Sequence, residues 1–279
     1  NIASFLTTRD NLRQQILDLM TLRLSVPTMD LDDDGTPDLD TSNVHFIGHS
    51  LGTLNGIPFV EIANETETTD DNILTANFLT PGGNISRLAE NSRSFAPSLL
   101  LGLLGADLSG PARGDIDFEA FFSVFQASLD AADPINYVGN LSNTTSTTKA
   151  LFSEVVGDTT IPNNASPTPV DILHPDFIGT TPNPFAGLSF GEGIAAPLAG
   201  TDPLEKVSGA TTIDSSAALG INFLRYTAAS GATHGTPVLP LTDGEKLVFG
   251  EMIRQALTMI LSDGANIAVT NAGLLQTVD

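Results

Sequence analysis

The feature that most restricts how this chain can fold is a short apolar run that ends in a glycine-flanked serine. Val44–Ile47 is β-rich and apolar, and Gly48-His49-Ser50-Leu51-Gly52 follows it directly. The run predicts a buried strand, and the residues after it can continue as a helix. So tight a passage from strand to helix strains the backbone at the serine, and the flanking glycines let the chain bend without a Cβ clash. The motif therefore indicates an α/β protein.

The same turn makes Ser50 a candidate nucleophile. At such a turn the serine Oγ projects from the end of the sheet, and the N–H of the next residue, Leu51, points at the oxyanion that forms on an attacked carbonyl. A G-x-S-x-G pentapeptide also arises by chance, so the alternative is a structural Gly-Ser-Gly turn. The position between a strand and a helical segment favours the catalytic interpretation.

A serine nucleophile needs a general base, and the chain has four histidines. His45 lies in the predicted strand, where it is expected to pack, and His49 adjoins Ser50 at a turn whose neighbouring side chains point apart. His174 lies in a long insertion, and His234 follows a strand and precedes the last helix. In hydrolases with this serine turn the histidine sits on a late loop, so His234 is the predicted base and His174 its rival. The alternative is that His234 is a solvated loop histidine without a catalytic role.

The acid that orients such a histidine is predicted to be Asp158. It follows Val155-Val156-Gly157, at the carboxyl end of a β-rich run, where parallel sheets present their ligands. A buried carboxylate there would hold the imidazole tautomer and stabilise the imidazolium. The alternative is an aspartate that merely forms a turn after glycine. Four rival aspartates lack this strand context: Asp171, Asp176, Asp202 and Asp214.

The remaining periodicity predicts a mostly parallel sheet with helices between its strands. The strand candidates besides Val44–Gly48 are Ile73–Leu79, Ala150–Val156 and Ile221–Thr227. The predicted helices are Leu12–Leu24 and Gly244–Leu261, which place leucine, isoleucine, valine and methionine at helical spacing. Two long insertions separate these elements: an apolar one over 84–148, and one over 162–210 that is rich in Pro, Gly and Thr and is expected to be an ordered loop.

Three segments occur in an order that is familiar from one protein family. The segments are Phe46–Gly52 after an acidic loop, Val156–Asn163, and His234–Pro240 followed by the helix around Glu251–Gln255. Together they resemble the bacterial extracellular lipases of the α/β-hydrolase type, a family that includes surface-exposed lysophospholipases. The resemblance runs from about Thr8 to Asn271 and is strongest in these segments.

The resemblance implies an α/β-hydrolase fold and a Ser50–Asp158–His234 triad that hydrolyses esters through an acyl-enzyme. It also implies a secreted or cell-surface protein whose substrate is a lipid or another carboxylic ester. A lysophospholipase or phospholipase of the same fold is one alternative, and a catalytically silent surface-binding module is another. No cofactor is expected to be required for catalysis.

The chain departs from the family pattern before the serine turn. In the family, strands precede that turn and one of their loops supplies a second oxyanion donor, whereas here the serine is residue 50. We therefore expect N-terminal strands that this chain lacks, either missing or cleaved and retained as a separate chain. Residues 1–83 and 149–279 are expected to form the hydrolase core, and 84–148 a cap or lid over it.

An acidic loop, Asp30–Asp40, resembles a calcium-binding loop because carboxylates at alternate positions followed by glycine can converge on one hard cation. An EF-hand would have an acidic ligand at its twelfth position, where Thr41 stands. The interpretation is therefore a structural Ca²⁺, with a solvated acidic turn as the alternative. The candidate ligands are Asp30, Asp32, Asp34, Thr36 and Asp38.

Composition excludes several classes of protein. A net charge of −22 argues against a nucleic-acid partner, because phosphate binding requires a basic surface. The absence of cysteine excludes disulfide scaffolds, thiolate metal sites and cysteine nucleophiles. No apolar run reaches the roughly 18 residues of a membrane span. With 41% hydrophobic residues the chain can form a sizeable core.

Overall fold

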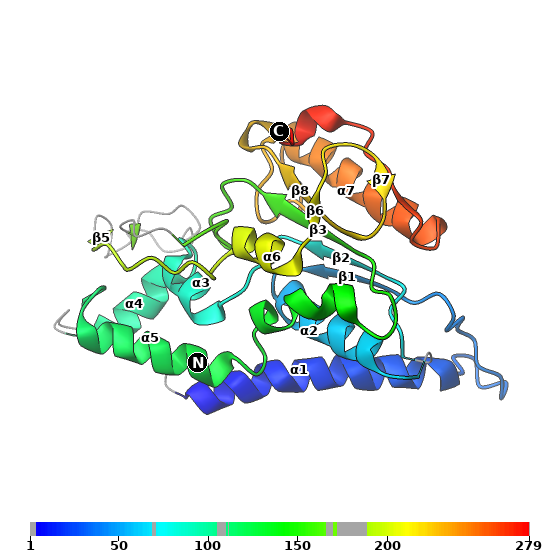
Figure 1. The fold of residues 1–279 in the computed structure, drawn as a ribbon, viewed down its shortest axis with the longest axis horizontal. Helices are drawn as coiled ribbons and strands as arrows, with labels where there is room; N and C mark the ends of the chain where they lie inside the picture. The colour runs from blue at the N-terminus through cyan, green and yellow to red at the C-terminus, as the bar shows by residue number, and fades with distance from the viewer. Residues whose placement is uncertain are drawn as a thin grey trace.

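Short apolar runs that alternate with helices form one parallel sheet in this protein (Figure 1). The structure, a computed structural model, describes residues 4–68, 71–104, 110, 112–165, 170–171 and 189–278. In this part of the chain the sheet has five strands in the order β1-β2-β3-β8-β6, and every neighbouring pair is parallel. The strands are β1 (His45–His49), β2 (Thr75–Leu79), β3 (Ala150–Val155), β8 (Ile221–Tyr226) and β6 (Thr211–Thr212).

Helices cover both faces of this sheet. Helices α2 and α6 lie against one face, α1 packs on the outer side of α2, and α7 covers the other face (Figure 1). Helices α3, α4 and α5 lie together between β2 and β3 in the chain. The helices are α1 (Phe5–Ser25), α2 (Leu51–Glu65), α3 (Ile85–Asn91), α4 (Ala96–Leu104), α5 (Ile116–Leu129), α6 (Thr201–Ser208) and α7 (Asp243–Leu261).

Short elements complete the described fold. Two antiparallel pairs of two-residue strands lie outside the sheet: β4 (Val170–Asp171) with β5 (Ser189–Phe190), and β7 (Ala217–Ala218) with β9 (Asn266–Ile267). Short 3₁₀ helices occur at Val26–Thr28, Pro134–Asn136, Val138–Asn143, Ala228–Ser230 and Ala272–Leu274. Among the described residues, no helix combines the length and apolarity needed to cross a bilayer.

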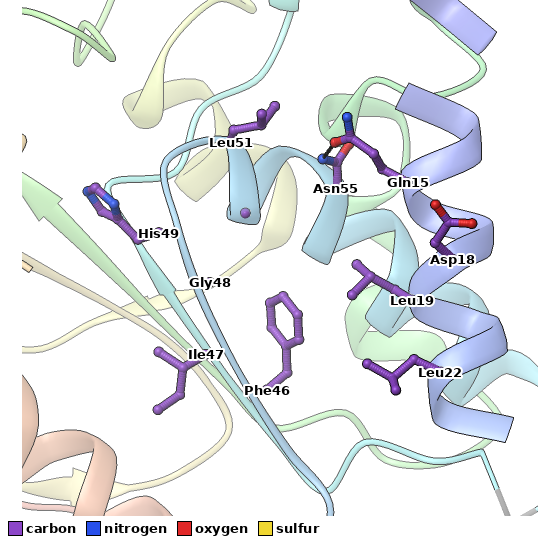
Figure 2. A pocket seen from close by; sticks show the side chains of 11 residues that line it. Gln15, Asp18, Leu19, Leu22, Phe46, Ile47, Gly48, His49, Leu51 and Asn55 are labelled. Carbon is purple, nitrogen blue, oxygen red and sulfur yellow. Dashed lines mark hydrogen bonds between the residues drawn. The ribbon is translucent and has the colours of Figure 1, made fainter. Parts of the chain in front are cut away.

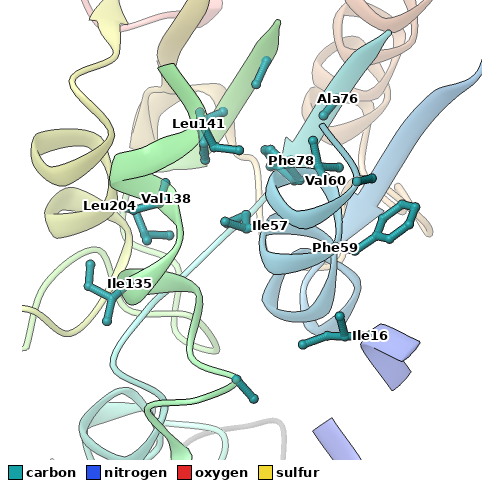
Figure 3. Packing of buried hydrophobic residues seen from close by; sticks show 14 of the residues in the cluster. Ile16, Ile57, Phe59, Val60, Ala76, Phe78, Ile135, Val138, Leu141 and Leu204 are labelled. Carbon is teal, nitrogen blue, oxygen red and sulfur yellow. The ribbon is translucent and has the colours of Figure 1, made fainter. Parts of the chain in front are cut away.

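Two hydrophobic cores hold the layers together, one on each face of the sheet. The larger core joins α2 to Phe78 and Phe152 of the sheet, and it includes Ile57 and Val60, both 0% exposed (Figure 3). The second core packs α7 against the opposite face, around the buried Tyr226. Because each fully buried large side chain contributes about 1.5–3 kcal/mol, the two cores fix the sheet between its helices.

The predicted α/β class with a mostly parallel sheet is confirmed, and the strands lie within two residues of their predicted bounds. The expectation that residues 162–210 form only loop is wrong for Thr201–Ser208, which is helix α6. This helix has Pro203 in its first turn and ends at Gly209, whose φ of +65° is typical of a glycine after a helix. These end signals lie in a segment whose average composition indicates a loop. The division into a core and a cap at residues 84 and 148 stays a prediction.

A buried carboxyl group lies in the sheet, under α6. Glu154 of β3 is 2% exposed and stands beside Arg225 of β8, whose Nε lies 3.3 Å from Glu154 Oε1. The same guanidinium also pairs with Asp202, at 3.3 Å, and with Glu205. Burial raises the pKa of Glu154 to about 8, and the negative charge of Asp202 adds to the rise. The folded protein therefore favours the protonated form of Glu154 near neutral pH.

The folded protein should lose stability as Glu154 ionises. A glutamate with an ordinary pKa of 4.5 is ionised in the unfolded chain above that pH, whereas folded Glu154 keeps its proton up to about pH 8. The stability that protonated Glu154 contributes is therefore complete below pH 4.5 and is lost as pH rises through 8. The free energy of unfolding falls by at most about 1.4 kcal/mol per pH unit over this range. Urea unfolding of wild type and Glu154→Gln across this range should show a flatter pH dependence in the variant. Glu67→Gln, at an exposed position, is the control, and equal slopes for wild type and Glu154→Gln would contradict this account.

Candidate active site

The turn between β1 and α2 holds Ser50 in a backbone conformation that non-glycine residues rarely adopt. Its φ is 54° and its ψ is −119°. Ser50 N–H donates to Leu79 O at the end of β2 (3.1 Å), and Ser50 O accepts from the backbone N–H and the hydroxyl of Thr53 (2.8 and 2.6 Å). Such strain costs about 1–3 kcal/mol and persists only where the surroundings over-determine the conformation. The hydrogen bonds on both sides of the turn provide that constraint.

The glycines around the turn have different roles. A Cβ on Gly48 would lie 2.7 Å from Gly52 O and 2.8 Å from a ring carbon of Phe46, so only glycine fits there. A Cβ on Gly52 would meet no described atom within 4 Å, so the expected steric need for Gly52 is not found in this structure. Gly56 is also required here, which the sequence did not reveal: the Phe46 ring packs directly on its Cα and leaves no room for a Cβ. Phe46 thus holds β1 against α2 on either side of Ser50.

Asp158 lies just beyond β3 and is almost fully buried. Gly157, with a φ of +84°, turns the chain after the strand. One carboxylate oxygen of Asp158, Oδ1, accepts the backbone N–H groups of Thr160 (2.7 Å) and Ile161 (3.0 Å). The other oxygen, Oδ2, lies 2.7 Å from His234 Nδ1. These hydrogen bonds satisfy the oxygens of a buried polar group whose burial would be costly without partners.

His234 connects Asp158 with Ser50. Its Nε2 lies 2.8 Å from Ser50 Oγ, across 184 positions of sequence. A carboxylate only accepts, so Nδ1 of His234 carries the hydrogen, and in the neutral ring Nε2 is then free to accept from the serine hydroxyl. The structure thus brings together the three residues that the sequence proposed as nucleophile, base and acid. Their catalytic roles stay predictions.

The loop that carries His234 is anchored to the start of α7. Glu245 Oε1 accepts the Thr233 hydroxyl (2.7 Å), and Glu245 Oε2 accepts the Thr242 N–H (2.8 Å) while the Thr242 hydroxyl caps the helix in return. The hydrogen bond from the Thr242 backbone, followed by that from Thr233, lowers the pKa of Glu245 to about 2. The spacing Thr-x-x-Glu before an apolar run is the local signal that could have identified this cap. An ionised Glu245 therefore holds this loop, residues 231–242, which is called the base loop after the predicted role of His234.

The other histidines have different surroundings. His45 Nδ1 lies 2.8 Å from Thr75 Oγ1, in agreement with the expected packing role. His49 does not contact Ser50 Oγ through its ring in the described structure, and its Nε2 lies 2.8 Å from the backbone oxygen of His234. Sequence reasoning missed this contact, which no local pattern signals. His174 lies outside the described residues.

Two of the rival aspartates, Asp202 and Asp214, have other partners than His234. Asp202 pairs with Arg225, and Asp214 accepts the backbone N–H of Val278 (3.0 Å). Asp171 lies in β4, and Asp176 lies outside the described residues. Among the aspartates whose side chains the structure describes, Asp158 is the one bonded to the His234 ring.

Leu51, the predicted oxyanion residue, is the first residue of α2. No acceptor for its N–H occurs in the described part of the chain, as expected at a helix N-terminus. Such a terminus attracts negative charge because the N–H dipoles align there. A second oxyanion donor is not identified by the described contacts.

Two cavities, each of about 530 Å³, flank the candidate triad. The first lies between β1, the start of α2 and α1, with Phe46, Leu19 and Leu22 on its apolar wall and Leu51 at its rim (Figure 2). In Figure 2 Asn55 of α2 donates a hydrogen bond to Gln15 of α1 across this groove. The second cavity is lined by the Asp158 and His234 loops and by the start of α7. His49 and Leu51, the neighbours of Ser50 in the chain, line the first cavity, and Asp158 and His234 line the second.

The phenylalanines of the 84–148 insertion are mostly internal. Phe118 and Phe122 are at most 1% exposed and pack on Leu100 of α4, and Phe125 belongs to the large core beside α2. For Phe118 and Phe122 this favours the alternative that they pack on their own segment rather than line an acyl pocket, whereas Phe125 packs in the main core. Phe95 is 49% exposed. It adjoins Ser94, whose hydroxyl lies 2.9 Å from Thr160 Oγ1 in the Asp158 loop.

The acidic loop brings part of the predicted calcium-ligand set together. One carboxylate oxygen from each of Asp30, Asp32 and Asp38 lies within 4.8 Å of the others. Asp34 instead accepts the N–H and the hydroxyl of Thr36, which lowers the pKa of Asp34. Carboxylate oxygens are the ligands that a hard cation prefers, but Asp30, Asp32 and Asp38 also accept backbone N–H groups of this loop. Calcium binding stays a prediction.

The strain at Ser50 should be measurable as a difference between two variants. Ser50→Ala and Ser50→Gly both remove the hydroxyl, but only glycine adopts a positive φ without steric cost. We expect Ser50→Gly to be more stable than Ser50→Ala by about 1 kcal/mol, after subtraction of the extra entropy that glycine loses on folding. Urea unfolding followed by circular dichroism gives this difference. A Ser50→Ala protein as stable as Ser50→Gly would show that the turn is not strained.

Comparison of the chain with models of protein families, with curated proteins and with solved structures found no match. The geometry around Ser50 is therefore the feature of this protein that points to a function. That geometry consists of a strained serine at a strand–helix turn, a histidine within hydrogen-bond distance of its hydroxyl, and a buried aspartate on the far side of the ring.

Proposed function

We propose that this protein is a serine carboxylic ester hydrolase with an α/β-hydrolase fold. The observation that carries the proposal is the continuous hydrogen-bonded path Ser50 Oγ–His234 Nε2–Asp158 Oδ2, with distances of 2.8 and 2.7 Å. A nucleophile, a base and an orienting acid in this geometry recur on unrelated folds that catalyse acyl transfer. The parallel sheet with the serine turn after β1 supports the assignment of the fold.

The first half of the reaction forms an acyl-enzyme. Ser50 Oγ attacks the ester carbonyl while His234 Nε2 takes its proton, and Asp158 stabilises the resulting imidazolium. The Leu51 N–H at the start of α2 stabilises the negative charge on the carbonyl oxygen. His234 then gives the proton to the leaving alcohol, and the C–O bond to that alcohol breaks.

The second half releases the acid. Water enters the place of the alcohol and gives a proton to His234 Nε2 as its oxygen attacks the acyl carbonyl. Collapse of the tetrahedral intermediate returns the proton to Ser50 Oγ and frees the carboxylic acid. The base loop must hold its position through both halves, and the ionised Glu245 supports that requirement.

The groove between β1 and α1 supports a substrate with an apolar group. Its walls carry Leu19, Leu22 and Phe46, and Leu51 at its rim is the residue after the nucleophile. An acyl chain in this groove would start at the carbonyl next to Ser50 and remove apolar surface from water. We therefore propose acyl esters, lipids among them, as the substrate class. A secreted or surface location remains part of the same proposal.

Ser50→Ala should reduce the hydrolysis of p-nitrophenyl esters by at least about 10⁴-fold, because loss of the nucleophile removes the covalent route. The rate of p-nitrophenol release from acetate, butyrate, octanoate and palmitate esters measures both activity and acyl preference. Wild type should also be labelled by a fluorophosphonate at Ser50. Thr53→Ser, which keeps the hydroxyl that caps Ser50 O, should retain activity. A hydrolysis rate that Ser50→Ala leaves unchanged would remove Ser50 as the nucleophile. A wild-type protein with neither turnover nor label would favour the silent-module alternative.

Asp158→Asn should lower kcat by about 10⁴-fold, because the amide no longer enforces the Nδ1–H tautomer of His234. The protein should still fold, since the amide oxygen can accept the N–H groups of Thr160 and Ile161. Steady-state kinetics with a butyrate ester and circular dichroism of the same sample separate these two effects. The matched control is Asp214→Asn, at an aspartate remote from His234. A folded Asp158→Asn enzyme with unchanged kcat would remove Asp158 from the mechanism.

A further inference from the structure

His49 lies beside the candidate triad, and the proposed mechanism gives it no role. It is the last residue of β1 and adjoins Ser50, and its ring projects on the side of β1 that faces away from α1 (Figure 2). Its Nε2 lies 2.8 Å from the backbone oxygen of His234. The two imidazole rings have their centres 4.9 Å apart, tilted by 41°. A side chain next to the nucleophile thus contacts the backbone of the base.

The partner atom fixes the direction of this hydrogen bond. A carbonyl oxygen only accepts, so Nε2 of His49 must carry the hydrogen and donate it. This excludes His49 Nε2 as the atom that takes the proton of Ser50, a task that the geometry leaves to His234 Nε2 at 2.8 Å. In the neutral ring the other nitrogen, Nδ1, carries no hydrogen. His49 therefore acts on the backbone of residue 234 rather than on the serine.

Three groups of bonds then hold His234. Asp158 orients its ring, Glu245 anchors the preceding Thr233, and His49 holds its carbonyl. Only the bond from His49 starts on the residue next to Ser50, so it joins the turn of the nucleophile directly to the backbone of the base. A displacement of about 1 Å between a nucleophile and its base can lower the rate about 100-fold, so the hydrogen bond from His49 is relevant to catalysis.

The charge state of His49 also matters, because His234 becomes positive during the reaction. The charged groups that face His49 are His234, whose proton disfavours a second positive charge, and Asp158, which favours it. Burial has the largest effect and lowers the pKa of His49; it outweighs the hydrogen bond to the His234 backbone and the charge of Asp158, both of which raise that pKa. A neutral His49 donates its hydrogen bond without repelling the imidazolium that forms 4.9 Å away.

We propose that His49 is a positioning residue: its Nε2–H holds the His234 carbonyl and thereby aligns His234 Nε2 with Ser50 Oγ. The inference rests on the proposed ester hydrolysis for its kinetic consequences. The hydrogen bond itself is independent of that function. The two can therefore be tested separately.

The kinetic test compares His49→Gln with His49→Asn. The glutamine Nε2–H reaches as far as the imidazole Nε2–H, whereas the amide of asparagine is one bond shorter and cannot reach the carbonyl. With p-nitrophenyl butyrate we expect His49→Asn to lower kcat by about 10- to 100-fold with KM changed by less than about threefold. His49→Gln should restore kcat to within about fivefold of wild type. His45→Gln, at the other histidine of β1, controls for general loss of a strand histidine and should leave kcat unchanged.

Each outcome has a defined meaning. A wild-type protein that turns over ester and is labelled at Ser50, with equal kcat in both His49 variants, overturns the positioning role and leaves the proposed function intact. A wild-type protein without turnover or label overturns the proposed function instead. In that case, ¹⁵N NMR of the histidine rings still tests the contact: the Nε2–H tautomer of His49 at neutral pH, coupled to the His234 carbonyl, supports it. An Nδ1–H tautomer overturns it. Thermal unfolding of both variants identifies any loss of folded protein.

Discussion

The arrangement of the site depends on the strained backbone of Ser50. A positive φ at a non-glycine residue has to be held by its neighbours, and here the end of β2 holds the N–H while the first turn of α2 holds the carbonyl. Because Gly48 has no side chain, Phe46 can pack across the turn onto Gly56, which keeps β1 and α2 close together. The strain and the packing have the same result: the serine side chain leaves the sheet at its C-terminal edge with the N-terminus of α2 beside it.

Parallel pairing explains why residues so distant in sequence meet at that edge. β1, β3 and β8 all run in the same direction, so the segments after them, which contain Ser50, Asp158 and His234, leave the sheet at the same end. Burial of Asp158 would be costly without hydrogen-bond partners. The two N–H groups of the following turn are such partners, in addition to the imidazole of His234. Asp158 is thus stabilised by its own loop, and its second carboxyl oxygen orients the ring of His234.

The extent to which the sequence predicted this arrangement follows the range of the interactions. Ser50 and Asp158 are defined by the few residues around them, and His234 by its place between a strand and the last helix, so local patterns identified all three. The packing of Phe46 on Gly56 and the bond from His49 to His234 join residues whose spacing has no pattern, and they became visible only in three dimensions. Helix α6 was missed for another reason: its end signals are local, but they stand in a segment whose average composition indicates a loop.

Two glutamates of this protein show how the surroundings decide the charge of a carboxyl group, through hydrogen bonds at Glu245 and through burial at Glu154. Glu245 accepts four donors at the start of α7, and its pKa falls to about 2, so the stability it contributes is present above pH 4.5 and is lost as pH falls toward 2. Glu154 shares one guanidinium with two other carboxylates inside the fold, and its pKa rises to about 8. The first glutamate holds the base loop only when ionised, and the second fits the sheet best when neutral. Above pH 4.5 and well below pH 8 both conditions are met, so the ionised Glu245 anchors the base loop while Glu154 stays protonated under α6.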